Sequence, residues 1–397
     1  MSPGQNRCSS SVGGRRGLLL GLGALACAGL ARAQPARPLL RVGPTQALRS
    51  LASAARQARD GCDIEVDAGD YVADTAVWQA SKLSLRAVGG RVRLIAGGAS
   101  AEGKGIFVTR GEQISIEGFD FSGARVADGN GAGIRLERGS LRLRDCSFRD
   151  CEMGLLTAND PAIRLEVENC EFGHAAPRPG QAPAHLLYAG RIGRLLVTGC
   201  YFHHGRIGHL LKSRAALSLV AYNRLSDEIG GRASYELEFP NGGVAIVLGN
   251  VIQQSAQTEN PHLLAYGAEG LGPGRHELCL VHNTLVDNLP QDGVYLRVSP
   301  GAARVMAVNN LLVGGARFAA EAGWDLRNNL PVDWDMFVQA ARDNYAPRPG
   351  SPLRGRVAEP GPGPDGQPLR LLRQYRHPHA SQALAGPALF PGALQGA

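Results

Sequence analysis

The chain has 397 residues, of which 44% are hydrophobic, 19% are charged and 53 are glycine. This composition excludes a disordered chain, and 8 cysteines in so long a chain exclude a small disulfide scaffold. The formal net charge of +7 could indicate a nucleic-acid-binding protein, but residues 1–33 contribute four arginines and no acidic residue to it. The remainder carries 38 basic and 35 acidic residues, with the arginines dispersed. We therefore expect no nucleic-acid partner.

Residues 1–33 have the pattern of a cleavable export signal. A basic segment leads into an apolar run at 17–30, which is followed by the small-x-small sequence Ala-Arg-Ala at 31–33. The run is shorter than the ~20 residues of a membrane span. Arg15 and Arg16 directly precede this mild, glycine-rich run, which is typical of a twin-arginine signal, with a general secretion signal as the alternative. The sequence predicts a periplasmic or secreted protein without a membrane span in the mature chain.

A short strand motif recurs about every 26 residues through the rest of the chain. Its fixed position is occupied by Phe119, Cys146, Cys170, Cys200, Asn223, Asn250, Asn283, Asn310 and Asn329. The units hold strands of 4–8 residues and no long helical pattern, which excludes leucine-rich, ankyrin and tetratricopeptide arrays. A propeller blade needs roughly 40 residues or more. We therefore predict an all-β, single-domain, right-handed parallel β-helix of about ten coils over residues 34–345.

Stacked coils turn the fixed position into a column of side chains. The asparagine amides can then donate to one neighbour and accept from the other, which satisfies buried polar groups. Cysteines one coil apart have poor disulfide geometry, so we expect buried thiols, with a Cys146–Cys151 bridge as the alternative.

Both ends of the β-helix need a cover because open strand edges are exposed. Residues 45–59 predict an amphipathic capping helix with Thr45 as its N-cap, from apolar residues at helical spacing. Residues 346–397 are rich in proline and glycine. We expect them to form a tail that wraps the last coil without a fold of its own.

Three segments give the sequence a family resemblance: DGCDIEVDAGDY, LRDCSFRDCEMGLL and the terminal FPGALQ. They resemble secreted bacterial right-handed β-helix proteins of the pectate-lyase-like superfamily, over roughly residues 40–397. The chain looks closest to a group exported by the twin-arginine route that has no assigned activity. The resemblance implies an acidic polysaccharide as partner and a lyase, hydrolase, epimerase or non-catalytic protein. We expect a monomer.

The second strand of each coil offers the densest cluster of ionisable side chains. These strands lie in GHLLKSRA (208–215), SYELEF (234–239), PHLLAYG (261–267) and GVYLRV (293–298). Successive side chains of a strand point to opposite faces, and strict alternation of this kind places Tyr235, Leu237 and Phe239 inward. It predicts an outward groove formed by Lys212, Arg214, Glu236, Glu238, His262, Leu264, Tyr266, Tyr295 and Arg297. The preceding coil adds His185 or Tyr188, whose facing the pattern leaves open.

These groups suit β-elimination on a uronate, which requires a neutralised carboxylate, a base and an acid. Arg214 or Arg297 would neutralise the carboxylate, and Lys212 would be the base. The acid would be Tyr266, Tyr295 or His262. Substrate would also bind Tyr295, Glu236 and Asn241, which begins an Asn-Gly-Gly turn.

The predicted cofactor is either none or Ca²⁺ held by Glu236 and Glu238. Lys212-Ser213 with Glu236-x-Glu238 resembles the lysine and calcium segments of chondroitinase-B-type lyases, although here the acidic pair follows the lysine.

Other interpretations of the same residues stay open. Glu236 and Glu238 would lie about 6.5–7 Å apart at Cβ, which permits an inverting hydrolase. An epimerase needs much the same groups as a lyase. A non-catalytic glycan-binding or cell-envelope structural protein needs none of them, and the charges would then form a ladder of ion pairs. His203, His204 and His209 lie close in sequence, but alternation separates their directions and argues against zinc.

Overall fold

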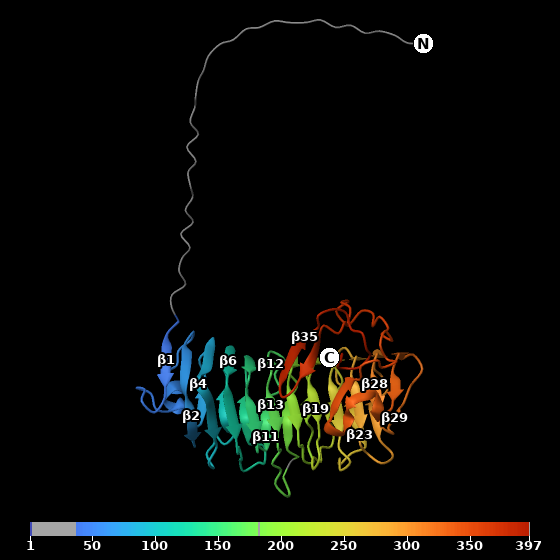
Figure 1. Cartoon of the computed structure of the whole chain (residues 1–397). Coiled ribbons are helices and arrows are strands. Elements are labelled where there is room, and N and C mark those ends of the chain that lie inside the picture. The colour runs from blue at the N-terminus through green and yellow to red at the C-terminus, as the bar shows by residue number, and fades with distance from the viewer. Residues whose placement is uncertain (2–36, 182, 397) are drawn as a thin grey trace. The chain divides into compact units, whose positions relative to one another are not determined.

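The repeated motif folds into stacked coils in the computed structural model, which describes Met1 and residues 37–181 and 183–396 (Figure 1). The predicted signal peptide lies outside the described residues. Residues from Arg37 onward form one unit. The predicted parallel β-solenoid is confirmed, because each strand pairs in parallel with its counterpart in the next coil.

One strand of each coil contributes to a ten-stranded parallel sheet. Its strands are β3 (Ala76–Trp78), β5 (Gly105–Thr109), β8 (Ala132–Leu136), β11 (Met153–Thr157), β14 (His185–Ala189), β17 (Leu211–Ser213), β20 (Leu237–Phe239), β23 (His262–Tyr266), β26 (Val294–Val298) and β29 (Arg317–Phe318). This sheet holds the predicted groove residues.

The remaining coil strands form a continuous second sheet with two rows that bend at the fixed position. The first row holds β1 (Leu39–Val42), β2 (Asp63–Val72), β4 (Leu83–Ile95), β6 (Gln113–Glu117), β9 (Ser140–Arg144), β12 (Arg164–Glu168), β15 (Arg194–Thr198), β18 (Leu217–Ala221), β21 (Val244–Leu248), β24 (Glu277–Val281), β27 (Arg304–Val308) and β30 (Asp325–Arg327). The second row holds β7 (Phe119–Ser122), β10 (Ser147–Arg149), β13 (Glu171–Gly173), β16 (Tyr201–His203), β19 (Arg224–Ser226), β22 (Val251–Gln254), β25 (Thr284–Asp287), β28 (Leu311–Val313) and β31 (Leu330–Val332).

The asparagine column forms the predicted ladder. Asn223 donates from Nδ2 to Oδ1 of Asn250 at 3.0 Å, Asn250 does the same to Asn283, and the chain continues through Asn310 to Asn329. Each asparagine oxygen also accepts a backbone N–H from the coil before it. The ladder therefore satisfies the buried backbone groups at the corner between the two rows.

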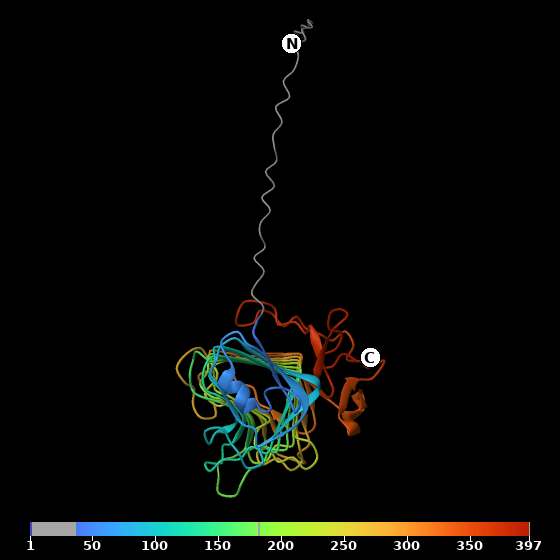
Figure 2. The same ribbon diagram turned by 90° about the vertical axis from the view of Figure 1, so that its left-hand side faces the viewer.

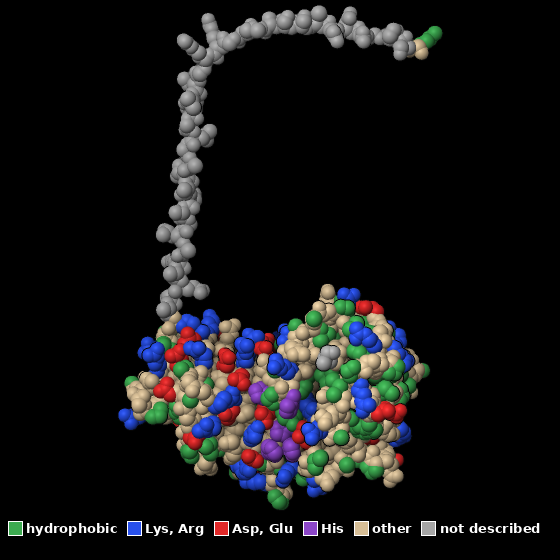
Figure 3. Space-filling view, in the orientation of Figure 1, with side chains coloured by type: hydrophobic (Ala, Val, Ile, Leu, Met, Phe, Trp, Pro, Cys, Tyr) green, Lys and Arg blue, Asp and Glu red, His purple; other side chains and the backbone are tan. Residues whose placement is uncertain are grey.

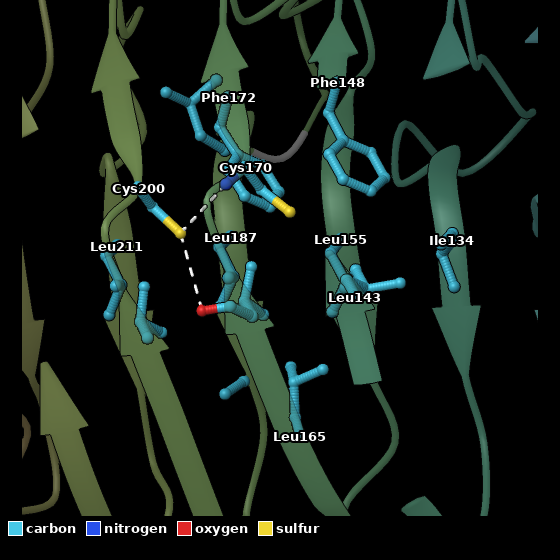
Figure 4. Packing of buried hydrophobic residues seen from close by; sticks show 14 of the residues in the cluster. Ile134, Leu143, Phe148, Leu155, Leu165, Cys170, Phe172, Leu187, Cys200 and Leu211 are labelled. Carbon is cyan, nitrogen blue, oxygen red and sulfur yellow. Dashed lines mark hydrogen bonds between the residues drawn. The ribbon is translucent and has the colours of Figure 1, made fainter. Parts of the chain in front are cut away.

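Aromatic rings and thiols fill the interior of the earlier coils. Phe121, Phe148, Phe172 and Phe202 stack with centroids 4.6 to 4.9 Å apart. Cys170 and Cys200 lie beside them, with the Cys170 N–H directed to the Cys200 sulfur at 3.4 Å (Figure 4). All six cysteines among the described residues are buried and unpaired, so the prediction of core thiols is confirmed and the Cys146–Cys151 alternative is wrong.

The N-terminal cap is shorter than predicted. Helix α1 spans Leu51–Gln57, and its N-cap is Ser50 rather than Thr45. Residues 43–48 form a turn instead, closed by the Gly43 N–H to Leu48 carbonyl bond. Asp74 accepts the first helical N–H groups, from Leu51 and Ala52, which fixes where the helix begins. Figure 2 shows this helix lying across the end of the first coils.

Residues 346–397 contact the last coil, where Arg327 and Asn328 donate to the carbonyls of Glu359, Pro360 and Arg356, but they also extend well beyond it. The described residues after β31 form no further coil strand, although the β-helix was predicted to continue to residue 345. They include η1 (Trp334–Met336), β32 (Phe337–Gln339), η2 (Ala340–Arg342), β33 (Asn344–Pro347), β34 (Arg373–Arg376) and β35 (Ala380–Ala383). β34 and β35 form an antiparallel hairpin, so the tail has local structure of its own. It runs back along the outside of the coils, where Leu371 packs on Tyr222 and His379 reaches the Asn169 carbonyl (Figures 1 and 2). Within the described residues, every helix is too short or too polar to cross a membrane.

Candidate functional site

Strict alternation fails where each strand of the ten-stranded sheet begins. Two consecutive residues face the interior there, as shown by Leu186 with Leu187, Glu236 with Leu237, and Leu263 with Leu264, all of which are buried. The backbone bonds align these pairs, because Leu211 N–H donates to Glu236 O and Glu236 N–H donates to Leu263 O. The strand bends as it enters the sheet, which lets both side chains pack inside.

Because of this bend, four residues that were predicted to line the outward groove point inward instead. Glu236 and Tyr295 take the first inward position, and Leu264 takes the second. Tyr266 also points inward, packs near Phe239 and donates from its hydroxyl to the Gly243 carbonyl at 2.6 Å. They are core residues and do not line an outward groove.

Tyr235, which was expected inside, instead joins an outer row of rings. His185 and His209 are 4.6 Å apart at their centroids, and Tyr235 lies 5.0 Å from His209 and 6.3 Å from His262. A second outer row follows from the register: Tyr188, Lys212, Glu238, Ala265 and Arg297 occupy successive strands. The outward facing of Lys212, Glu238, His262 and Arg297 thus agrees with the prediction.

Lys212 and Arg214 converge on a single carboxylate. Lys212 Nζ lies 2.9 Å from Oε1 of Glu269, and Arg214 Nη2 lies 2.7 Å from Oε2 of the same residue. Both cations also lie 5.7 Å from the centroid of the Tyr188 ring, whose hydroxyl accepts the Arg214 Nε–H at 2.8 Å. We call Tyr188, Lys212 and Arg214 the cationic cradle.

Asn241 fixes the loop that carries Glu269. Arg214 bonds to the Asn241 side-chain oxygen, and the Asn241 amide donates to the Gly270 carbonyl at 3.1 Å. Gly242 follows with φ of 72°, and a side chain there would collide with His276. The glycine in this turn is therefore required for the loop to approach the cradle.

The inner edge of the cradle is closed by a buried carboxylate. Glu238 is 2% exposed, and its Oε2 lies 3.1 Å from Lys212 Nζ and 2.9 Å from His209 Nε2. Burial alone would raise its pKa, but the hydrogen bond from His209 and the charge of Lys212 lower it overall. Burial and the nearby cations hold the pKa of His185 well below its usual range, so this imidazole is neutral.

The residues do not fit the predicted calcium site. Glu236 faces the interior and Glu238 the outside of the same strand, so they cannot share one ion. Glu238 is also committed to His209 and Lys212. The same separation removes the carboxylate pair that an inverting hydrolase would need.

The sequence did not indicate that Glu269 and His209 belong to this site. It left open whether His185 or Tyr188 faces outward. Glu269 lies 55 residues from Arg214, in a loop with no repeat signature. His209 belongs to the outer row only because the strand bends. The coil register could have indicated Tyr188, since it pairs directly with Lys212.

The comparisons with known proteins concern the fold alone. No family model and no curated protein matches this sequence. Among solved structures, the chain is similar to the crystal structure of the pectate lyase Pel9A, with a TM-score of 0.62 and 12% sequence identity. The match covers 91% of this chain and 97% of that chain. The two chains therefore share the parallel β-helix architecture.

Proposed function

We propose that this protein binds an acidic polysaccharide on the outer face of the ten-stranded sheet, and that β-elimination is the reaction its groups serve. The observation that carries the proposal is the bridge from Glu269 to Lys212 and Arg214. Two cations, one in β17 and one directly after it, hold the two oxygens of one carboxylate. A uronate presents the same planar anion and can take the place of Glu269.

Exchange of the carboxylate is physically feasible because Glu269 is the most exposed member of the cluster. Its side chain is 45% exposed, whereas Lys212 and Arg214 are 10% and 13% exposed. Glu269 can therefore turn out into water while a carboxylate of the ligand takes over its contacts. Lys212 keeps Glu238 as a second counter-ion, but Arg214 pairs with no other carboxylate among the described residues, so an incoming carboxylate would offset the loss of Glu269.

The cradle also offers a surface for a sugar ring. Tyr188 lies against both cations and is half-buried, as is His262 at the far end of the outer row. His185, His209 and Tyr235 between them are buried. A polymer of uronates can therefore place a carboxylate on the cations and an apolar ring face on Tyr188.

In β-elimination a base removes the proton α to the carboxylate, that electron pair forms the new double bond, and the glycosidic oxygen departs with a proton. Lys212 and Arg214 stabilise the charge that develops on the carboxylate. The predicted base role of Lys212 is disfavoured, because its Nζ is already engaged by two carboxylates, Glu238 and Glu269. Proton transfer is proposed instead for the Tyr188 hydroxyl, which touches Arg214.

The test is a panel of uronate polymers with a neutral glucan as control, measured for binding and for the ultraviolet absorbance of an unsaturated product. We expect binding to uronates only. Arg214→Ala should weaken it roughly tenfold or more, since a charge-assisted hydrogen bond contributes about 1.5–3 kcal/mol. Arg142→Ala removes an exposed arginine from β9 on another face and should leave binding unchanged. Equal losses in the two variants, or no uronate binding, would overturn the proposal.

A non-catalytic glycan-binding or cell-envelope role is the second candidate. It is favoured by the ion pair between Lys212 and Glu238. Both side chains are buried and engaged with one another, so neither is free to act on a substrate. Uronate binding with no unsaturated product and no change in the polymer would establish this role. An epimerized but uncleaved polymer would identify the epimerase alternative.

A further inference from the structure

Three histidines from two successive coils meet on a different sheet from the cationic cradle. His174 follows β13, while His203 ends β16 and His204 follows it. One ring nitrogen from each lies within 4.8 Å of the other two. Figure 3 shows histidine side chains gathered near the middle of this face, around the place of β13 in Figure 1. Alternation does not separate His203 from His204, because His204 has a left-handed backbone with φ of 51°.

The hydrogen bonds of this cluster determine which nitrogen of His203 carries the lone pair. His203 Nε2 lies 3.1 Å from Oε1 of Glu171, which also pairs with Arg149, so the carboxylate accepts the Nε2–H. The Nδ1 of His203 is then the bare nitrogen. It lies 2.7 Å from Nδ1 of His204, which must supply the shared proton.

The backbone leaves room for this arrangement. The His203 ring lies directly over Gly173, where any Cβ would collide with ring atoms. His174 and His204 stack with their ring centroids 4.5 Å apart, and the His203 ring lies edge-on to both, at 5.1 and 4.9 Å. An imidazole ligates a metal ion through the lone pair of one ring nitrogen.

We propose that His174, His203 and His204 form a binding site for a divalent late transition metal ion such as Zn²⁺. Zinc–nitrogen bonds of ~2.0–2.1 Å in tetrahedral geometry separate ligand nitrogens by about 3.3 Å. The His203 and His204 nitrogens therefore need to part by only about 0.6 Å, as the metal replaces their shared proton. Glu171 accepts the other N–H of His203 and acts as a positioning residue, as outer carboxylates do for metal-bound histidines.

The experiment is calorimetric titration of the whole protein, without a polyhistidine tag, with ZnCl₂. We expect one saturable site per chain. His203→Ala should abolish it, and Glu171→Gln should weaken it about 10–100-fold. Gly173→Ala keeps every ligand but displaces the His203 ring, so it should also weaken binding. His262→Ala removes a partly buried histidine of the ten-stranded sheet and serves as the matched control.

A second readout separates ligation from folding. Co²⁺ bound by three nitrogens gives visible absorption bands, which His174→Gln should diminish while the far-ultraviolet circular dichroism of the variant stays that of the parent. The absence of saturable Zn²⁺ binding would overturn the proposal. An affinity that survives both His203→Ala and Gly173→Ala, or that falls equally in His262→Ala, would do the same.

Discussion

At the scale of single residues, the interior of the later coils holds polar groups that an apolar core would exclude. Glu236 is fully buried, and neither of its oxygens has a hydrogen-bond partner among the described residues. Asp227 is held by the Gly205 and Ala233 N–H groups, yet burial still raises its pKa to about 7. Burial, together with the charges of Asp227 and Asp287, raises the pKa of Glu236 well above its usual range. These acids are protonated in the folded protein at mildly acidic pH.

Glu236→Gln should therefore flatten the dependence of stability on pH. Above about pH 4.5 the unfolded chain releases the Glu236 proton while the folded chain retains it, so stability falls as pH rises, by roughly 1.4 kcal/mol per pH unit for one proton. Thermal melting from pH 4 to 8 should show the variant gaining stability over the parent toward neutral pH, with little difference at pH 4. A gain that is the same at every pH would contradict the assignment.

Glu269→Gln should strengthen uronate binding, because the loop carboxylate would no longer compete for Lys212 and Arg214. A several-fold tighter dissociation constant is expected, since about 1 kcal/mol corresponds to roughly a fivefold change. Glu259→Gln, which removes a carboxylate paired with Arg232 elsewhere, is the control. Weaker binding in Glu269→Gln would mean that the loop carboxylate assists the ligand.

At the scale of elements, the corner between the two rows of strands depends on the asparagine ladder. Asn250 donates to the Val220 carbonyl and to Asn283, and its oxygen accepts from both the backbone and the side chain of Asn223. Four bonds converge on one buried side chain. Asn329 ends the ladder and has no asparagine beyond it in the repeat.

Asn250→Ala should destabilise the protein by about 3 kcal/mol or more, because several buried groups lose their partners at about 1–3 kcal/mol each. Asn329→Ala should cost less, since Asn329 is only half-buried. The midpoints of urea unfolding for the two variants test this order. Equal midpoints would show that the ladder is not the source of the stability.

At the scale of the whole molecule, the tail completes the fold by covering an apolar strip on the coils. Ala221, Leu248, Val281 and Val308 present this strip on the outer side of β18 to β27, and Leu369 and Leu371 of the tail pack on it. By register, the corresponding positions of earlier coils are polar or charged: Thr198, Glu168 and Arg144. The tail therefore runs back along the coils, because packing there buries apolar side chains that the outer side of the later coils would otherwise expose to water.

Leu371→Asp should detach the tail, whereas Leu372→Asp should not. The two leucines are adjacent, but Leu371 is 3% exposed and Leu372 is 65% exposed. Limited proteolysis should cut the tail of the Leu371→Asp variant faster than that of the parent, with increased binding of a hydrophobic dye to the uncovered strip. Equal cleavage of the two variants would contradict this account.

The sequence by itself determined the coils, the fixed column and the buried thiols, because these depend on local strand patterns and on a repeat that stacks like residues. It also determined the outward facing of Lys212, Glu238 and Arg297 by alternation. Alternation failed for Glu236 and Tyr295, because the strand bends where it enters the sheet, and the bend depends on packing against the rest of the coil.

Only the tertiary structure decided which side chains from different coils come into contact. Glu269 reaches Lys212 through a loop of irregular length, and His174 meets His203 and His204 through the register of neighbouring coils. The tail finds its strip across sequence separations that run from 61 residues (Val308 to Leu369) to 150 residues (Ala221 to Leu371). A repeat specifies which positions stack, but the loops between its strands set which side chains converge, and their lengths carry no periodic signal.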